Sequence, residues 1–249
     1  MNSSRRYFLK VAGLSTFALA AGAAKAQAGY EEYPGELKAK RWAMVIDTRK
    51  FQTVEDMQPV IDACRKAHNI PTIPGPKEVK WIWDDTFEHA FADDPAPMLP
   101  ENIEKRPFFL LCNHCTNPSC VRVCPAGATY KTPGGLVAID YHRCVGCRFC
   151  MAACPYGSRS FNFQDPRPFI KELNPAYPTR MRGVVEKCTF CSERLEKGLM
   201  PACVEASNGA ILFGDLNDPD SAVRRVLAKN FSMRRKPSLG TDPGVYYII

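Results

Sequence analysis

Cysteines are the residues of this sequence whose spacing points most directly to chemistry. The chain has 12 cysteines among 249 residues. One run reads Cys144-Val-Gly-Cys147-Arg-Phe-Cys150-Met-Ala-Ala-Cys154-Pro155, with the spacing C-x2-C-x2-C-x3-C-P. Three thiolates this close together can bind three corners of one iron–sulfur cubane, and the fourth cysteine, carried away by the turn and proline, binds a neighbouring cluster. The run therefore indicates [4Fe-4S] clusters that share ligands.

Two further cysteine runs vary the same pattern. The first has two additional residues between its second and third cysteines, and the other has a long insertion before its last cysteine. They read Cys112-x2-Cys115-x4-Cys120-x3-Cys124-Pro125 and Cys188-x2-Cys191-x11-Cys203. Two runs that both end in C-x3-C-P strongly favour iron and sulfide.

Disulfides and structural zinc are the alternatives for these cysteines. An even number of cysteines in an exported protein commonly means disulfides, and zinc favours paired C-x2-C ribbons. Neither arrangement requires a third cysteine three residues further on, or a proline after the fourth. Iron–sulfur chemistry is the interpretation that the spacing favours. A zinc- or disulfide-stabilised interaction module stays open as the alternative.

The N-terminus has the pattern of an export signal. Ser4-Arg5-Arg6-Tyr7-Phe8-Leu9-Lys10 matches the twin-arginine consensus, and uncharged residues 11–24 and small residues up to Ala28 follow. We therefore predict a twin-arginine signal peptide over residues 1–28 and a periplasmic protein. A twin-arginine substrate crosses the membrane already folded, which suits clusters built in the cytoplasm. The apolar stretch is short for a bilayer-spanning helix, so a retained anchor is the less favoured alternative.

Composition and charge exclude several classes of protein. Apolar residues at 45% and charged residues at 24% are ordinary for a globular chain, which excludes disorder. The net charge is +7, but removal of residues 1–28 leaves 29 basic and 26 acidic residues, a net charge of +3. This small excess gives no support to nucleic-acid binding. No catalytic triad, phosphate-binding glycine loop or paired carboxylate site stands out, so we expect no catalytic residues in this chain.

From about residue 41 to the C-terminus, the sequence resembles the four-cluster ferredoxin-type subunits of membrane-bound respiratory oxidoreductases. Members of this family pass electrons to or from quinone-reacting membrane proteins of the NrfD/PsrC type. The resemblance includes the motifs Ala63-Cys64-Arg-Lys-Ala-His68-Asn69-Ile-Pro71, Glu186-Lys187-Cys188-Thr-Phe-Cys191, Pro201-Ala-Cys203-Val-Glu-Ala, Phe213-Gly-Asp-Leu-Asn-Asp-Pro219 and Gly240-Thr-Asp-Pro-Gly-Val-Tyr-Tyr-Ile248.

The resemblance also implies which cysteines share a cluster. Family members have four motifs that exchange ligands crosswise, but here the first motif keeps only Cys64 and the fourth ends in Ser207. The missing ligands would have held a single cluster, so three complete [4Fe-4S] clusters are implied. The first set is Cys112, Cys115, Cys120 and Cys154; the second is Cys144, Cys147, Cys150 and Cys124; the third is Cys188, Cys191, Cys203 and Cys64. Ser207 as a ligand, and Cys64 as a plain core residue, are the alternatives.

The implied fold is α+β, with tandem bacterial-type [4Fe-4S] ferredoxin lobes, sparse secondary structure and loop insertions. We expect an N-terminal segment with the degenerate first motif over residues 29–103. A ferredoxin lobe with two clusters is expected over 104–165, and a second lobe, which includes the Cys64 segment, over 166–215. Residues 216–249 are expected to form a C-terminal tail, and residues 71–100 and 165–182 are expected to be insertions that cover the lobes.

Several local elements must position the cysteines. Val54, Met57, Val60, Ile61 and Cys64 recur at near-helical spacing, which predicts a helix from Thr53 to His68 in the volume of the missing cluster. Pro59 is expected to limit the start of this helix or to kink it. We also predict a strand over residues 135–139 and short helices after each C-x3-C. Trp81 and Trp83 lie in an insertion, where they either pack in the core or serve in docking.

The resemblance implies a non-catalytic electron-transfer subunit. Its implied partners are an NrfD-like integral membrane subunit that interacts with quinone and a multiheme cytochrome c. The chain is most similar to the periplasmic iron–sulfur subunit of Dsr membrane complexes, which are associated with sulfite reduction. Nitrite-, polysulfide- and hydrogenase-linked quinone oxidoreductases are the alternatives. Because the C-terminal segment is polar, another subunit is expected to hold the chain at the membrane.

Charged residues beside the cysteines allow two interpretations. Arg122, Arg143, Arg148 and Lys187 could raise cluster potentials, or they could be solvated surface charge. His114 lies inside the second cysteine run, where we expect hydrogen bonding rather than ligation.

Overall fold

The computed structural model of the protein describes residues 35–93 and 98–249, and the predicted signal peptide lies outside them. The described residues form a mixed α+β fold of short elements, as the sequence predicts. The strands are β1 (Trp42–Asp47), β2 (Ile82–Asp85), β3 (Phe108–Leu111), β4 (Thr129–Lys131), β5 (Val137–Ile139), β6 (Ser160–Phe161), β7 (Val185–Glu186), β8 (Ile211–Asp215), β9 (Ser232–Met233) and β10 (Val245–Ile248). The helices are α2 (Val54–Ala67), α3 (Phe87–Ala90), α4 (Glu101–Glu104), α5 (Ser119–Arg122), α6 (Phe149–Ala152), α7 (Ser192–Leu195), α8 (Ala202–Ala206) and α9 (Ala222–Leu227), with 3-10 turns at Thr48–Lys50, Gly75–Lys77, Arg167–Phe169 and Pro237–Leu239.

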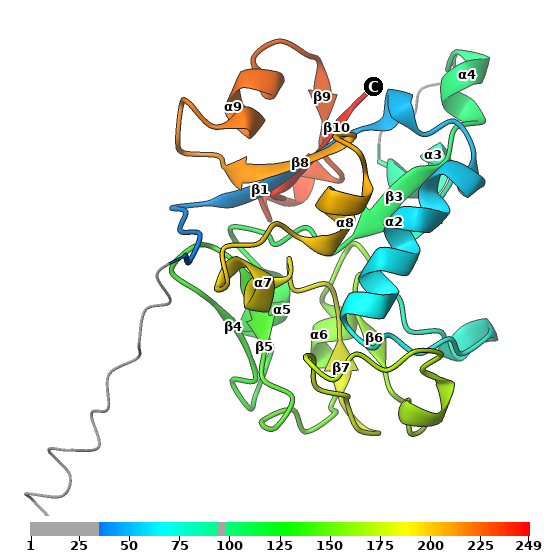
Figure 1. Ribbon diagram of the computed structural model, residues 1–249, viewed down its shortest axis with the longest axis vertical. Helices are drawn as coiled ribbons and strands as arrows, with labels where there is room; N and C mark the ends of the chain where they lie inside the picture. Colours follow the sequence, from blue (N-terminus) through cyan, green and yellow to red (C-terminus); the bar gives the residue numbers. More distant parts are fainter. Residues whose placement is uncertain (1–34, 94–97) are drawn as a thin grey trace, which may run out of the picture. The chain divides into compact units, whose positions relative to one another are not determined.

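The largest sheet has four strands in the order β8-β1-β10-β9 (Figure 1). Strand β1 runs parallel to β10 and antiparallel to β8. Trp42, Met44 and Ile46 face the main core, whereas Ala43 and Val45 face a smaller core covered by α9. Burial on both faces explains why β1 is almost continuously apolar. Residues 216–249, which the sequence suggested were a tail, supply β9, α9 and the interior strand β10.

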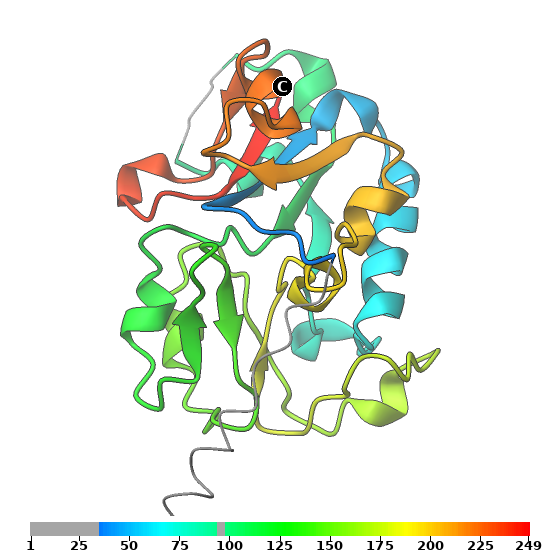
Figure 2. The same cartoon turned by 60° about the vertical axis from the view of Figure 1, so that its left-hand side comes forward.

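Helix α2 occupies the segment in which the sequence predicts a helix. Thr53 caps its N-terminus in a reciprocal capping box with Asp56, and His68 follows its last residue. The helix begins before Pro59 and continues through it, so the proline does not limit its start. Of the five predicted apolar positions four are buried, but Val54 is 44% exposed because it is the first residue of the helix. Both ribbon views show α2 beside α8 (Figures 1 and 2).

Small two-stranded sheets accompany the cysteine runs. Strand β4 pairs with β5, and β6 pairs with β7. The predicted strand over 135–139 is therefore confirmed in its last three residues. The short helices α5 and α6 overlap the two C-x3-C intervals, and α8 overlaps the corresponding interval from Cys203 to Ser207. The prediction that short helices follow each interval was therefore wrong. In two of the runs a proline follows the last cysteine. The residue before a proline rarely adopts the helical backbone conformation, so a helix does not continue through that cysteine.

Trp81 is a core residue and not a docking residue. Its side chain is almost fully buried, and its Nε1–H donates to the Glu186 carboxylate at 2.9 Å. The same carboxylate forms a buried ion pair with Arg180, whose guanidinium lies 5.3 Å from the Trp81 ring. Trp83 is partly buried against the same core. Among the described residues, we find no helix long and apolar enough to span a membrane.

Candidate metal centres

The structure joins none of the twelve cysteines, all of which lie in its described part, in a disulfide. The four cysteines of the first set border one cavity. Cys112 and Cys120 come from the end of β3 and from α5, and Cys154 follows α6. The crosswise contribution of Cys154 depends on the packing of α5 against α6.

The second set borders a separate cavity. Cys144 and Cys147 lie on the loop before α6, Cys150 lies within α6, and Cys124 comes from the preceding run. Gly146 is needed here, because a Cβ atom at this position would lie 2.3 Å from the Gly183 carbonyl oxygen. This close approach packs the loop against the segment that leads into β7.

The third set is buried in the main core. Cys64 is in α2, Cys188 and Cys191 flank the turn between β7 and α7, and Cys203 is in α8. The pKa of Cys64 is strongly raised. The main cause is desolvation, and the next causes are the nearby thiolates of Cys188, Cys191 and Cys203. The structure therefore brings Cys64 together with three sulfurs that follow it by more than a hundred residues in sequence.

The first C-x2-C turn of each of the three cysteine runs has the same backbone conformation. The residue before the second cysteine has a positive φ angle in each turn: 40° at His114, 70° at Gly146 and 55° at Phe190. For a bulky residue this conformation is uncommon and costs free energy, so it marks a turn that the surroundings must hold in place. The rings of His114 and Phe190 also stack, with their centroids 3.7 Å apart. The turns of the first and third sets are therefore in direct contact.

Two buried polar groups show that the surroundings of these cysteines suit an iron–sulfur cluster. Asn113 borders the first cavity, and its side-chain amide has no hydrogen-bond partner among the described residues. The hydroxyl of Thr189, between Cys188 and Cys191, is equally unpartnered. Buried groups of this kind are costly unless a partner is present. Inorganic sulfides accept hydrogen bonds, so four thiolates beside a free donor fit a [4Fe-4S] cluster.

Burial controls the acidity of the thiols. Desolvation raises the pKa of Cys115 and of Cys203 to about 12. Desolvation acts in the same direction on Cys124, but backbone N–H groups of Thr129, Ala128 and Ala126 outweigh it and lower the pKa of this thiol. A bound iron cluster supplies the positive charge that makes buried cysteines thiolates.

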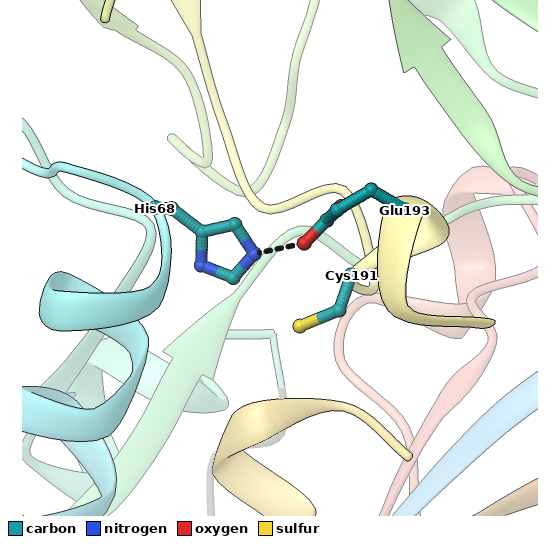
Figure 3. A group of neighbouring side chains, drawn as sticks. All are labelled: His68, Cys191 and Glu193. Carbon is teal, nitrogen blue, oxygen red and sulfur yellow. Dashed lines mark hydrogen bonds and ion pairs between the residues drawn. The ribbon is translucent and has the colours of Figure 1, made fainter. Parts of the chain in front are cut away.

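A mixed group of donors lies beside the third set (Figure 3). The donor atoms of His68, Cys191 and Glu193 all lie within 4.8 Å of one another. His68 Nε2 contacts the Glu193 carboxylate at 2.9 Å, and its Nδ1 lies 3.0 Å from the Cys64 carbonyl oxygen. A single zinc ion accepts such ligands, but both nitrogens of His68 already face oxygen acceptors. The histidine therefore links the turn of Cys191 to the end of α2.

His114 forms hydrogen bonds through both ring nitrogens, as the sequence predicts. Its Nδ1 accepts from the Val137 backbone N–H at 3.0 Å, which leaves Nε2–H to donate to the Cys188 carbonyl oxygen at 3.1 Å. Desolvation, and then the Lys187 charge, hold its pKa well below the ordinary value. Neutral His114 thus connects β5 with the turn of the third set.

The positive charges named from the sequence divide into two groups. Arg122, Arg143 and Arg148 are exposed, which favours solvated charge. Lys187 is completely buried, and its Nζ donates to the carbonyl oxygens of Val137 and Cys188.

Arg159, a further buried cation beside the cysteines, was not predicted from the sequence. Its guanidinium lies 3.0 Å from Cys120 Sγ and 3.2 Å from the Thr129 hydroxyl. Burial acts to lower its pKa, but the thiolates, Cys120 first, raise it overall. Arg159 lies outside the cysteine runs, so no spacing rule could have identified it.

Ser207 keeps the backbone position of a closing ligand without the sulfur. Its hydroxyl donates to the Val204 carbonyl oxygen at 2.7 Å and accepts from the Ile211 backbone N–H at 3.0 Å. These bonds within the chain explain a serine here without a metal.

Comparison with known proteins adds independent findings. Residues 106–166 match the model of the 4Fe-4S dicluster domain. The chain is 39% identical to the Hdr-like menaquinol oxidoreductase iron-sulfur subunit 1 of Archaeoglobus fulgidus, over 98% of this chain and 97% of the relative. It is 37% identical to the menaquinone reductase iron-sulfur cluster-binding subunit of Nitratidesulfovibrio vulgaris, over 86% and 90%. A homologue of protein NrfC from Haemophilus influenzae is 33% identical, over 85% and 81%.

Proposed function

This chain belongs to the family of 4Fe-4S electron-transfer subunits of quinol oxidoreductase-type complexes, and from that premise we propose that it relays electrons through three clusters. The observation that carries the proposal is the grouping of the sulfurs. Two separate cavities are each bordered by the four cysteines that the ligand-sharing pattern assigns to one cluster. When bound, the clusters supply reversible one-electron chemistry.

The proposed ligands are the three sets of four cysteines named above. The proposed arrangement that holds them is a tandem of ferredoxin lobes. Cys112 contributes to raising the pKa of Cys188, and Cys120 does the same for Cys150. The first set therefore has both other sets as neighbours, so we propose the relay order second, first, third. The chain's own contribution is to fix the three sets at short range and to exclude water from the third.

Access differs along this relay. Cys147 of the second set is exposed, and Val145 and Phe149 beside it are 70% and 59% exposed. All four cysteines of the third set are buried. A redox partner can therefore approach the second set most closely.

We further propose that the partners are an NrfD-like, quinone-interacting membrane subunit and a multiheme cytochrome c, on the periplasmic side of the membrane. The twin-arginine pattern of residues 4–10 supports this location. The loss of one cluster's ligands supports a Dsr-type complex of sulfur metabolism, in which this chain would correspond to the DsrO-like subunit. Subunits of nitrite-, polysulfide- or hydrogenase-linked complexes stay the alternative.

The decisive experiment is anaerobic analysis of iron and acid-labile sulfide, followed by electron paramagnetic resonance of the dithionite-reduced protein. Three clusters predict about 12 iron and about 12 sulfide per chain. A value near 16 would mean that Ser207 and other residues hold a fourth cluster. Zinc without sulfide would refute electron transfer and favour the zinc-stabilised interaction module.

A further inference from the structure

Arg159 is a buried cation without a carboxylate. Its side chain is 5% exposed, and no carboxylate of the described residues forms an ion pair with it. The same molecule shows what a compensated buried arginine looks like, because Arg180 lies 2.7 Å from the Glu186 carboxylate. An uncompensated buried charge is strongly destabilising. The nearest source of negative charge for Arg159 is the thiolate of Cys120, whose Sγ lies 3.0 Å from the guanidinium.

The contacts of the Arg159 guanidinium reach the surroundings of two different ligand sets. Its guanidinium contacts Cys120 Sγ of the first set. Its guanidinium also donates to the Thr129 hydroxyl at 3.2 Å, and Thr129 borders the cavity of the second set. The arginine thus lies at the junction of the first and second sets.

Lys187 has the corresponding position at the other junction. Its ammonium donates only to carbonyl oxygens, one of which belongs to Cys188 of the third set. His114, in the turn between Cys112 and Cys115 of the first set, donates to the same Cys188 carbonyl oxygen as Lys187. No carboxylate of the described residues lies within ion-pair distance of Lys187. The carboxylate of the adjacent Glu186 is instead bonded to Arg180, Trp81 and Asn162.

A fixed buried cation favours the more negative state of any redox group beside it. Because water is excluded, this effect is screened much less than that of a surface charge. A cation shared by two sites acts on both, whereas a cation beside one site acts on one. The first set has both cations as neighbours, and each of the other sets has one.

Building on the proposed function, we propose that Arg159 and Lys187 are junction residues that each raise the reduction potentials of two neighbouring clusters. Arg159 acts on the first and second, and Lys187 acts on the first and third. The first cluster, in the middle of the relay, thereby has its reduction potential raised by both cations, which favours its reduced state.

The test is a potentiometric titration of the purified full chain, followed by electron paramagnetic resonance. The signals are first assigned with Cys147→Ser for the second set and Cys203→Ser for the third. Arg159→Gln is expected to lower the potentials of the first and second signals and to leave the third unchanged. Lys187→Gln is expected to lower the first and third signals and to leave the second unchanged.

Matched variants separate charge from structure. Arg159→Lys and Lys187→Arg keep the charge and should hold the potentials near those of the wild type. Arg143→Gln removes an exposed charge beside Cys144 and should shift no signal. If Arg159→Gln does not assemble its clusters, the signal shifts measured in Lys187→Gln alone test the inference.

Two outcomes would overturn the inference: a shift confined to one signal, or an equal shift of all three. A charge-conserving variant that shifts as much as the glutamine variant would also overturn it. The proposed function itself fails differently, through a wild-type protein that holds no iron and sulfide.

Discussion

The second and third ligand sets use related cysteine spacing but lie in very different surroundings. The second set lies in loops around α6, with Cys147 exposed and only a small apolar cluster behind it. The third set is enclosed by the main core, which includes Cys64, Cys188 and Cys203 among its members. The C-x2-C turn fixes local ligand geometry in both places. The deeper burial of the third set comes from the elements that supply its remaining ligands, above all α2.

The comparison shows how one turn serves two purposes. Near the surface it leaves a site within reach of a partner. Inside the core it makes the site part of the packing, so that metal binding and folding become coupled. We therefore expect changes near the third set to affect stability, and changes near the second set to affect access.

The largest effect is expected from removing a ligand. Both Cys203→Ser and Cys147→Ser should lose about a third of the iron, since each site of this type holds four. Only Cys203→Ser should also lower the melting temperature of the still folded protein, because its sulfur is buried in the main core. Iron analysis and thermal unfolding followed by circular dichroism measure both effects. An equal loss of thermal stability in the two variants would contradict the comparison.

Truncation of a core side chain on α2 is expected to be the next largest effect. Met57 is completely buried on the helix that carries Cys64. Met57→Ala should lower the free energy of unfolding by about 3 kcal/mol, because it leaves a cavity. The matched change near the second set, Val145→Ala, should stay within about 0.5 kcal/mol because Val145 is exposed. Denaturant titration measures both, and similar costs would show that the two regions are equally packed.

Ser207 tests whether the missing cluster has left a structural requirement. Ser207→Ala removes the acceptor of the buried Ile211 N–H and should cost about 2 kcal/mol of unfolding free energy. Ser207→Cys should add no iron, because its hydroxyl position is bonded to the chain and three other ligands are absent from the first motif. Additional iron in Ser207→Cys would show that a fourth site persists.

The smallest effect concerns the start of α2. Thr53→Ala removes the side-chain cap that accepts from the Asp56 backbone N–H, and should lower the free energy of unfolding by about 1 kcal/mol. The exposed neighbour substitution Val54→Ala should change it much less. Because the second set receives no ligand from α2, its resonance signal should be unchanged in Thr53→Ala. Loss of that signal would contradict the separation of the two regions.

Local signals made part of this structure predictable. The period of Met57, Val60, Ile61 and Cys64, with a threonine ahead of it, defined α2 to within its caps. The same pattern wrongly placed Val54 in the core, because periodicity does not show at which residue of the helix burial begins. The helices of the C-x3-C runs were displaced because the fourth cysteine precedes a proline, which restricts its backbone.

Long-range features were not predictable in this way. Nothing local marks Arg159 as a partner of Cys120, which lies 39 residues earlier. The place of β10 between β1 and β9 also depends on pairing across almost the whole described chain. The twelve cysteines were apparent from the sequence, but the charges between their sites required the structure.

The parallel pairing of β1 with β10 has a consequence for biosynthesis. The Thr48 hydroxyl, directly after β1, donates to the Ile248 carbonyl oxygen 200 residues later. During translation, β1 therefore lacks its parallel partner until residues 245–248 have been made. A chain without β10 leaves one edge of apolar β1 unpaired, and that edge is exposed to chaperones and proteases.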